Sequence, residues 1–183
     1  MFAVTPRLLL RPGWPEDAQA LFAAINDQAI VRNLASAPWP YRPEDARTFL
    51  AQSVETTSPR WLIFRRTKKP PQLVGCIGID RQETGHAELG YWIARQHWGQ
   101  GYATEAGRAV LENARSLGHH QLVASHFVDN PASGSVLRKL GFRPTGETAQ
   151  RFSRGRGRNI RSVEFSCRLD DQQESEVMRQ MAA

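Results

Sequence analysis

The residues with the clearest capacity for chemistry lie in one stretch, from Glu88 through Glu105. There a strand-like segment enters a loop that contains Gly99 and Gly101, and the loop leads directly into a helical pattern. Glycines allow several backbone N–H groups to turn toward one point, and the start of a helix adds unpaired N–H groups at the positive end of its dipole. The stretch therefore predicts a binding site for a pyrophosphate.

Other nucleotide-binding motifs do not fit this loop. It contains no Gly-Lys-Ser/Thr sequence, which argues against a Walker-type site for a nucleoside triphosphate. The strand before it does not open the chain, and no third glycine follows at the required step, which argues against a Rossmann dinucleotide site. Two glycines by themselves also suit a tight strand-to-helix turn, so the interpretation needs support from the rest of the chain.

That support comes from a family resemblance. The sequence Gln96-x-x-Gly99-x-Gly101, followed by Tyr102, Ala103 and Thr104, resembles the Gln/Arg-x-x-Gly-x-Gly/Ala acetyl-CoA motif of the GNAT acetyltransferases, and its surroundings resemble the ribosomal-protein N-terminal acetyltransferase branch (RimJ/RimL-like). Further segments occur in the family's order and extend the resemblance over roughly residues 7 to 169: Leu10-Arg11-Pro12, Gly75-x-Ile77-Gly78, Glu88-Leu-Gly-Tyr-Trp-Ile, Asn130-Pro-Ala-Ser133 and Lys139-Leu-Gly-Phe142. Such a co-linear set is far more specific than the glycine loop alone.

The resemblance implies acetyl-CoA as cosubstrate, with no metal. It also implies that a bulge, which Gly90 could permit, splays the strand so that its backbone pairs with the pantetheine arm. An N–H near Ile93 or Ala94 would then polarise the thioester carbonyl. The residues expected at the cofactor are Trp92, Ile93, Ala94, Gln96, Trp98, Gly99, Gln100, Gly101, Tyr102, Ala103, Thr104, Asn130 and Ser133.

Transfer to an amine also needs proton movement. Glu88, at the start of the strand that feeds the loop, is the candidate base, acting through a water; the alternative is an exposed carboxylate at a strand end. Asn130 and Ser133 follow a strand end, where ligands bind, but both also suit a helix N-terminus. By resemblance Ser133 protonates the thiolate. The family's usual tyrosine acid corresponds to Leu137 here, so Ser133, Tyr102 or water must serve, and the donor stays open.

The acceptor side is less well defined by the sequence. Trp39 and Tyr41 stand in a proline-stiffened loop between two early helices, and by resemblance that loop forms part of the acceptor cleft.

The histidines show no ligand spacing with cysteines or carboxylates, so no metal site is expected. Five arginines fall in one Gly/Ser-rich segment, for which a solvated face is favoured over contact with RNA, the ribosome or the CoA 3′-phosphate: Arg151, Arg154, Arg156, Arg158 and Arg161.

The order of the elements that position these residues predicts a mixed α/β protein. The resemblance implies the GNAT-like acyl-CoA N-acyltransferase fold, a central twisted mixed sheet of about six to seven strands flanked by about four helices. A single domain is expected over residues 1–169, followed by a polar tail over 170–183. Helices are expected from Pro15 and Pro43, and over Tyr102 to Leu117 and Ala132 to Leu140. Strands are expected over Arg7–Arg11, Trp61–Arg65, Leu73–Asp80, Ala87–Ala94, Leu122–Val128, Phe142–Gln150 and Arg161–Leu169.

Composition narrows the functional classes. The 183 residues carry a formal charge of +6, which favours anionic partners without choosing among CoA, nucleic acid and membrane. No apolar run of about 18 residues and no secretory signal is recognisable, so a cytoplasmic location without membrane contact is expected. Cys76 and Cys167 suggest buried apolar residues.

Four functions remain in view. The first is an acetyl-CoA-dependent N-acetyltransferase acting on the N-terminal α-amine of a protein; the second is the same reaction on a small amine or an amino-acid-like metabolite. A non-catalytic acyl-CoA sensor is the third. A nucleic-acid binder is disfavoured, since charge alone would support it. The acyl-chain preference and a possible homodimer stay open.

Overall fold

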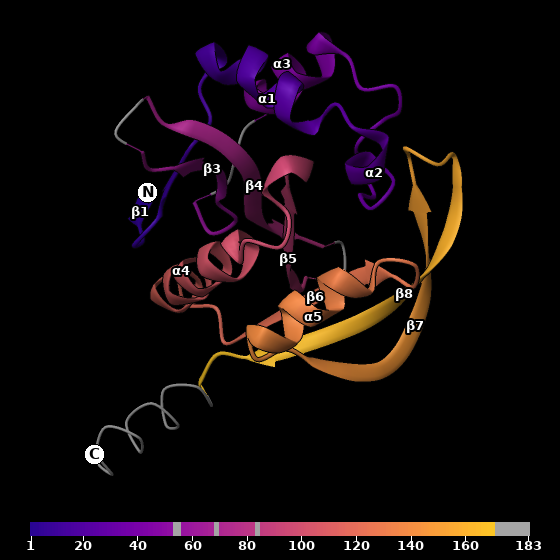
Figure 1. Ribbon diagram of the computed structural model, residues 1–183. Helices are drawn as coiled ribbons and strands as arrows, with labels where there is room; N and C mark the ends of the chain where they lie inside the picture. The colour runs from indigo at the N-terminus through magenta and orange to yellow at the C-terminus, as the bar shows by residue number, and fades with distance from the viewer. Residues whose placement is uncertain (53–55, 68–69, 83–84, 171–183) are drawn as a thin grey trace.

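The computed structural model describes residues 1–52, 56–67, 70–82 and 85–170. One mixed sheet carries the architecture, with strand order β1-β2-β3-β4-β5-β6-β8-β7, and helices cover both of its faces (Figure 1). The elements follow one another as β1 (Ala3–Val4), β2 (Leu8–Arg11), η1 (Pro15–Asp17), α1 (Ala18–Ile25), α2 (Gln28–Val31), α3 (Pro43–Ala51), β3 (Arg60–Arg65), β4 (Gln72–Arg81), β5 (Ala87–Ile93), η2 (Arg95–His97), α4 (Tyr102–Ser116), β6 (Gln121–Phe127), α5 (Pro131–Lys139), β7 (Arg143–Ser153) and β8 (Arg158–Arg168).

The sheet is covered because its central strands are apolar on both faces. Seven successive residues of β4, from Leu73 to Ile79, are buried, as expected for a strand sandwiched between two layers of helices. One core cluster joins the sheet to α4 and α5, and a second joins the opposite face to α1, α2, α3 and Tyr41. Strand β5, which leads into the glycine loop, thus lies between the two clusters, with Ile93 in the first and Trp92 in the second.

The predicted elements are confirmed with small shifts of their ends. Pro43 begins α3, where the Asp45 carboxylate accepts the N–H of Arg42 at 2.8 Å, and Pro15 begins a single 3₁₀ turn that continues into α1. The chain forms eight strands and five α-helices in its described part, slightly more than expected. The pattern did not reveal β1 or α2, because two and four residues are too few for a readable period.

Strands β5 and β6 separate soon after they meet. All neighbouring strands are antiparallel except these two, whose parallel pairing consists, in the described residues, of Glu88 opposite Val123. The predicted splay is therefore present. The bulge predicted at Gly90 is wrong: β4 and β5 stay in unbroken register from Arg81 opposite Ala87 to Gly75 opposite Ile93, so the gap arises because β6 diverges.

The β7–β8 hairpin is longer than its pattern suggested, and its tip packs against α2 (Figure 1). The N–H of Arg154 donates to the carbonyl of Ala35 at 2.8 Å, and the Arg156 guanidinium donates through Nε to the carbonyl of Arg32 at 2.6 Å. Gly155 fits closely here, since a Cβ would lie 2.6 Å from Cγ1 of Val31. These contacts fix the hairpin over the open edge of β5 and β6.

The expectation that the arginine segment is a solvated face is wrong at two positions. Arg151 forms an ion pair with Glu88, and Arg156 pairs with Asp129 at 2.7 Å with only 10% of its side chain exposed. Arg154, Arg158 and Arg161 are exposed as predicted. Pairing partners distant in sequence explain the error, because a local charge run gives no sign of them.

Asp129 provides a pH-dependent link between the hairpin and α2. Hydrogen bonds and charge from Arg156, assisted by Arg32 at 2.8 Å, lower the pKa of Asp129 from 3.8 to about 2 against the opposing effect of burial. A carboxyl group whose pKa is lower in the folded state adds stability above its unfolded pKa and loses it as pH falls through the folded pKa.

We therefore expect Asp129→Asn to lower the Tm by roughly 2 °C at neutral pH, a modest effect because the carboxylate is partly exposed. The Tm difference between wild type and Asp129→Asn should stay constant down to about pH 4 and close toward pH 2. Calorimetry of both proteins across this range measures it. A difference that is independent of pH would show that the ion pairs do not stabilise the fold.

None of the helices in the described ranges is long and apolar enough to cross a membrane. Cys76 and Cys167 are buried, as the sequence suggested, and burial raises the pKa of the Cys76 thiol to about 12. Of the predicted polar tail, residues 171–183 lie outside the described residues.

Candidate functional site

A cleft of about 1290 Å³ opens where β5 and β6 part. It is lined by most of the residues singled out from the sequence: Tyr41, Glu88, Trp92, Ile93, Trp98, Gly99, Gly101, Tyr102, Ala103, Thr104, Asn130 and Ser133. Four of the predicted residues are not among those that line it: Trp39, Ala94, Gln96 and Gln100. The cleft thus joins the loop, the strand gap and the N-terminus of α5 in one space.

The glycine loop has the conformation that its sequence predicted. Gly99 and Gly101 adopt φ of +73° and +79°, in the left-handed region that disfavours residues with a Cβ, and Gly101 is the N-cap of α4. The first-turn N–H groups of a helix have no intrahelical partners, so those of Tyr102, Ala103 and Thr104 are available to an anion. This end of the cleft can hold a pyrophosphate.

Arg7 and Glu105 hold the start of α4 in place. The Glu105 carboxylate accepts hydrogen bonds from Thr5 Oγ1 at 2.6 Å and from Arg7 Nε at 2.6 Å. Burial opposes ionisation of Glu105, but these hydrogen bonds outweigh it and lower its pKa. Arg7 also donates to the carbonyl of Gln100 at 3.0 Å and lies over the Tyr102 ring. The connection between β1 and β2 therefore braces the loop from outside the cleft.

The backbone N–H groups near the strand end are not equivalent. The N–H of Ala94 donates to the carbonyl of Val74 at 2.8 Å, so the prediction of Ala94 as a thioester contact is wrong. Since N–H directions alternate along a strand, that of Ile93 points away from β4, toward the gap. The carbonyl of Ile93 accepts the indole N–H of Trp98 at 2.6 Å, which ties the strand end to the loop.

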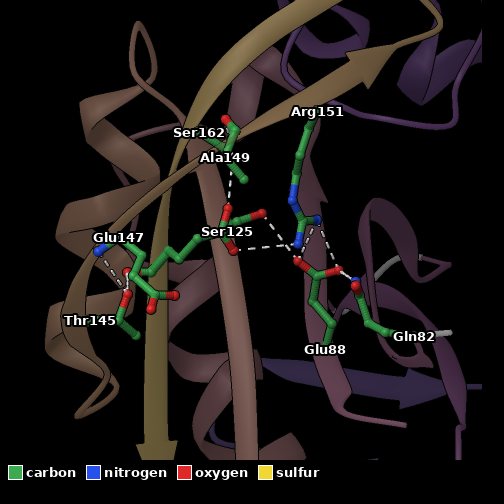
Figure 2. Close-up of polar contacts among 9 residues, drawn as sticks. Gln82, Glu88, Ser125, Thr145, Glu147, Ala149, Arg151 and Ser162 are labelled. Atoms are coloured by element: carbon green, nitrogen blue, oxygen red, sulfur yellow. Dashed lines mark hydrogen bonds and ion pairs between the residues drawn. The ribbon is translucent and has the colours of Figure 1, made fainter. Parts of the chain in front are cut away.

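Glu88 stands at the vertex of the gap and is held on several sides (Figure 2). Its carboxylate accepts hydrogen bonds from Arg151 at 2.8 and 3.1 Å, from Ser125 Oγ at 3.1 Å and from the side-chain amide of Gln82. Only 15% of the Glu88 side chain is exposed. The alternative of an exposed strand-end carboxylate is therefore wrong, and Glu88 is a fixed group facing the cleft.

Sequence reasoning missed the partners of Glu88. Arg151 comes from β7, 63 residues away, and also contacts Glu164 at 3.4 Å, while Ser125 comes from β6. Figure 2 shows Arg151 reaching from the hairpin to the Glu88 carboxylate. The β7–β8 hairpin carries Arg151 to Glu88 while its tip is held against the segment around α2, through Arg154 and Arg156, and a single sequence gives no signal for this meeting.

A second polar pair lies between β5 and α5. The Tyr91 hydroxyl is 2.8 Å from Ser133 Oγ and 3.1 Å from the Ser133 carbonyl oxygen, and both residues line the cleft. Burial raises the pKa of Tyr91 to about 12, although the hydrogen bond with Ser133 opposes this rise. The hydroxyl therefore stays protonated at neutral pH, where it can donate to Ser133. Tyr91 was not selected from the sequence as a site residue.

The N-terminus of α5 favours a ligand role for Asn130. Asn130 occupies the N-cap position, but its side chain makes no capping hydrogen bond and lines the cleft. The purely structural interpretation of Asn130 as a cap is thus weakened. Leu137, at the position of the family's tyrosine, is fully buried in the core and cannot reach a thiolate in the cleft.

The two aromatic residues proposed for the acceptor side differ in position. Tyr41 is 6% exposed and lines the cleft, and burial, with a smaller effect of the Asp45 charge, raises its pKa to about 12. Trp39 is partly exposed and does not line the cleft. Within the described ranges, no three His, Cys, Asp or Glu side chains are grouped so that they could hold a metal ion.

Comparison with known families agrees with this geometry. Residues 7–143 match the model of the acetyltransferase (GNAT) domain. The chain belongs to the GNAT acetyltransferases. This GNAT protein is an acetyl-CoA-dependent N-acetyltransferase, and the GNAT fold accounts for its mixed sheet with a parted pair of parallel strands.

Individual relatives extend the match. The chain is 34% identical to an uncharacterized N-acetyltransferase, YoaA of Bacillus subtilis, over 80% of this chain and 85% of the relative. Its fold is similar to that of a GNAT-family acetyltransferase from Bacillus anthracis, with a TM-score of 0.79 and 21% identity over 93% and 99% of the two chains. It is also similar to RimL, a ribosomal L7/L12 α-N-protein acetyltransferase solved with coenzyme A, with a TM-score of 0.77 and 21% identity over 93% and 99%.

The Tyr91–Ser133 pair yields a prediction for this GNAT enzyme. We expect Tyr91→Phe to lower kcat roughly five- to tenfold, because Ser133 Oγ loses the neighbouring hydroxyl that orients it and that can donate to it when it carries negative charge. The KM for acetyl-CoA should change little, since Phe preserves the packing of the ring.

A double-mutant cycle separates this role from a structural one. If both residues act in one step, Tyr91→Phe combined with Ser133→Ala should lower kcat no further than Ser133→Ala alone. Steady-state kinetics of the three variants across pH 6 to 9 measures the coupling. Additive losses of kcat would show that Tyr91 does not act through Ser133.

Proposed function

We propose that this enzyme acetylates the N-terminal α-amine of a protein. The observation that supports this acceptor best is the course of the cleft, which does not end at Glu88 but continues beside α2 and α3 to the hairpin tip, where Arg32, Pro38 and Arg154 line it. A peptide end can enter such a passage while the rest of the chain stays outside. The likeness to RimL, an α-N-protein acetyltransferase, points to the same acceptor.

The proposed reaction is direct transfer. The neutral amine attacks the thioester carbonyl of acetyl-CoA, a C–N bond forms, the C–S bond breaks, the amine loses one proton and the CoA thiolate gains one. Because an α-amine has a pKa of about 7.7 to 8.0, against about 10.4 for lysine, a modest base suffices. Glu88, held toward the cleft by Arg151 and Ser125, is the proposed base through one water.

The remaining groups serve the thioester and the cofactor. The N–H of Ile93 is the proposed donor to the carbonyl oxygen, because it points into the gap between β5 and β6. Ser133, hydrogen-bonded to Tyr91, is the proposed proton donor to the thiolate. The first turn of α4 is the proposed binding site of the pyrophosphate, and Asn130 is the proposed contact of the pantetheine arm. Both the first turn of α4 and Asn130 line the cleft.

The test follows CoA release with a thiol reagent. The purified protein is incubated with acetyl-CoA and one set of acceptors at a time. The first set is peptides that differ in their first residue, and the second is the same peptides blocked at the N-terminus but carrying a free lysine. The third set is polyamines, aminoglycosides and free amino acids. We expect release only with the peptides that have a free N-terminus, and mass spectrometry should place the acetyl group on the first residue. Release with small amines alone would contradict the proposed acceptor, and acetyl-CoA binding without any release would contradict turnover.

A further inference from the structure

A second concavity, of about 670 Å³, adjoins the acceptor half of the cleft. It shares Ala29 and Arg32 with the main cleft, and none of the described loop residues from Gly99 to Thr104 lines it. Its walls come from α2, from the start of η2 and from the hairpin tip: Asp27, Gln28, Ala29, Arg32, Arg95, Gly155, Arg156 and Arg158. It therefore belongs to the acceptor side rather than to the cofactor loop.

The walls of this concavity are fixed by the contacts between the hairpin and α2. Arg156 donates to the carbonyl of Arg32 at 2.6 Å, and the Asp129 carboxylate accepts from both guanidinium groups, at 2.7 Å from Arg156 and 2.8 Å from Arg32. Figure 1 shows the hairpin tip beside α2. The concavity is thus formed before any partner arrives, which lowers the entropic cost of binding.

The concavity carries a net positive charge. The four guanidinium groups of Arg32, Arg95, Arg156 and Arg158 face two carboxylates, those of Asp27 and Asp129, which leaves a surplus of two positive charges. Arg95 is 65% exposed and only loosely paired with Asp27, at 3.6 Å, while Arg158 is exposed. Guanidinium groups that keep free N–H donors bind carboxylates in a bidentate manner.

We infer that this concavity binds an acidic segment of the acceptor, a few residues beyond the amine that is acetylated. The inference rests on the proposed function, because it takes the acceptor to be a peptide. Since Arg32 lines both spaces, a chain that leaves the cleft past Arg32 enters the concavity that Arg95 and Arg158 line. Glutamate or aspartate side chains at that point meet the surplus positive charge. The enzyme thereby selects protein N-termini with acidic residues downstream.

Three peptide series test this selection. The peptides share their first two residues and differ over residues 3 to 8, which are acidic, neutral or basic. Wild-type enzyme should acetylate the acidic series with a kcat/KM roughly tenfold or more above the neutral series, and this preference should shrink as salt screens the charges. Equal kcat/KM for all three series would overturn the inference while leaving N-terminal acetylation intact.

Charge-reversal variants test whether the arginines of the concavity cause the preference for acidic peptides. Arg158→Glu, alone and with Arg95→Glu, should abolish the acidic preference and leave kcat/KM for neutral peptides unchanged. Arg108→Glu on the exposed face of α4 is the matched control and should retain the preference.

Two outcomes would assign the concavity differently. If Arg158→Glu raises the KM for acetyl-CoA but not for dephospho-acetyl-CoA, the concavity serves the CoA 3′-phosphate, and the inference is overturned. If no peptide is acetylated while small amines are, the proposed acceptor fails and the inference fails with it.

Discussion

Replacing Glu88 by Gln is expected to lower kcat roughly 100- to 1000-fold, with little change in acetyl-CoA affinity. The amide keeps the size of the carboxylate and one acceptor oxygen for Arg151 and Ser125, but it cannot take a proton from the amine through a water. Glu88 lies at the vertex of the strand gap and lines the cleft, so the loss should appear in the chemical step. Single-turnover kinetics with saturating acetyl-CoA measures that step directly.

Glu164→Gln is the matched control for this variant. Glu164 contacts the same arginine, Arg151, at 3.4 Å and accepts from Ser162 Oγ at 2.6 Å, yet it is not among the residues that line the cleft. Its replacement should therefore disturb the ion-pair network without removing the base. If Glu88→Gln and Glu164→Gln lowered kcat equally, Glu88 would be an anchor for the hairpin rather than the base.

Local patterns were sufficient to predict most of the helices and strands, and the family resemblance supplied their arrangement. The apolar periods of α1, α4 and α5 and the runs of β3, β4 and β5 are properties of neighbouring residues, and the structure confirms them within a few residues. The loop with Gly99 and Gly101 was equally visible, because a positive φ at a strand-to-helix junction demands glycine. The bulge that the family resemblance implied, and that Gly90 could permit, is absent, and the gap arises instead because β6 diverges from β5.

The surroundings of the cleft depend on contacts between distant parts of the chain. Glu88 meets Arg151 only because the β7–β8 hairpin packs with its tip against the segment around α2, and Tyr91 meets Ser133, 42 residues away, only because α5 packs over the sheet. Neither pair has a local sequence signature. The same holds for Arg156 and Asp129. Arg156 belongs to the loop that was expected to be solvated, but its ion pair with Asp129 holds it in the wall of the second concavity.

The conformation of the glycine loop should matter as much for binding as Glu88 does for turnover. We expect Gly101→Val to weaken acetyl-CoA binding roughly 10- to 100-fold, because a β-branched residue is strained at φ +79° by about 1 to 3 kcal/mol. The free loop can relieve this strain by leaving its native conformation, whereas the bound loop must restore it to aim the N–H groups of α4 at the pyrophosphate. A Cβ at Gly101 would meet Arg7 at an ordinary 3.5 Å, so steric overlap is not the cause.

Gly118→Val separates this effect from general instability. Gly118 has φ +85° just beyond the end of α4, and a Cβ added there would have no described atom within 4 Å, so the variant carries the same backbone strain at the far end of the same helix. Both variants should lower the Tm, but only Gly101→Val should raise the Kd of acetyl-CoA in titration calorimetry. Equal Kd values for the two variants would mean that the N-terminus of α4 does not hold the pyrophosphate, and the cofactor would then have to be placed elsewhere in the cleft.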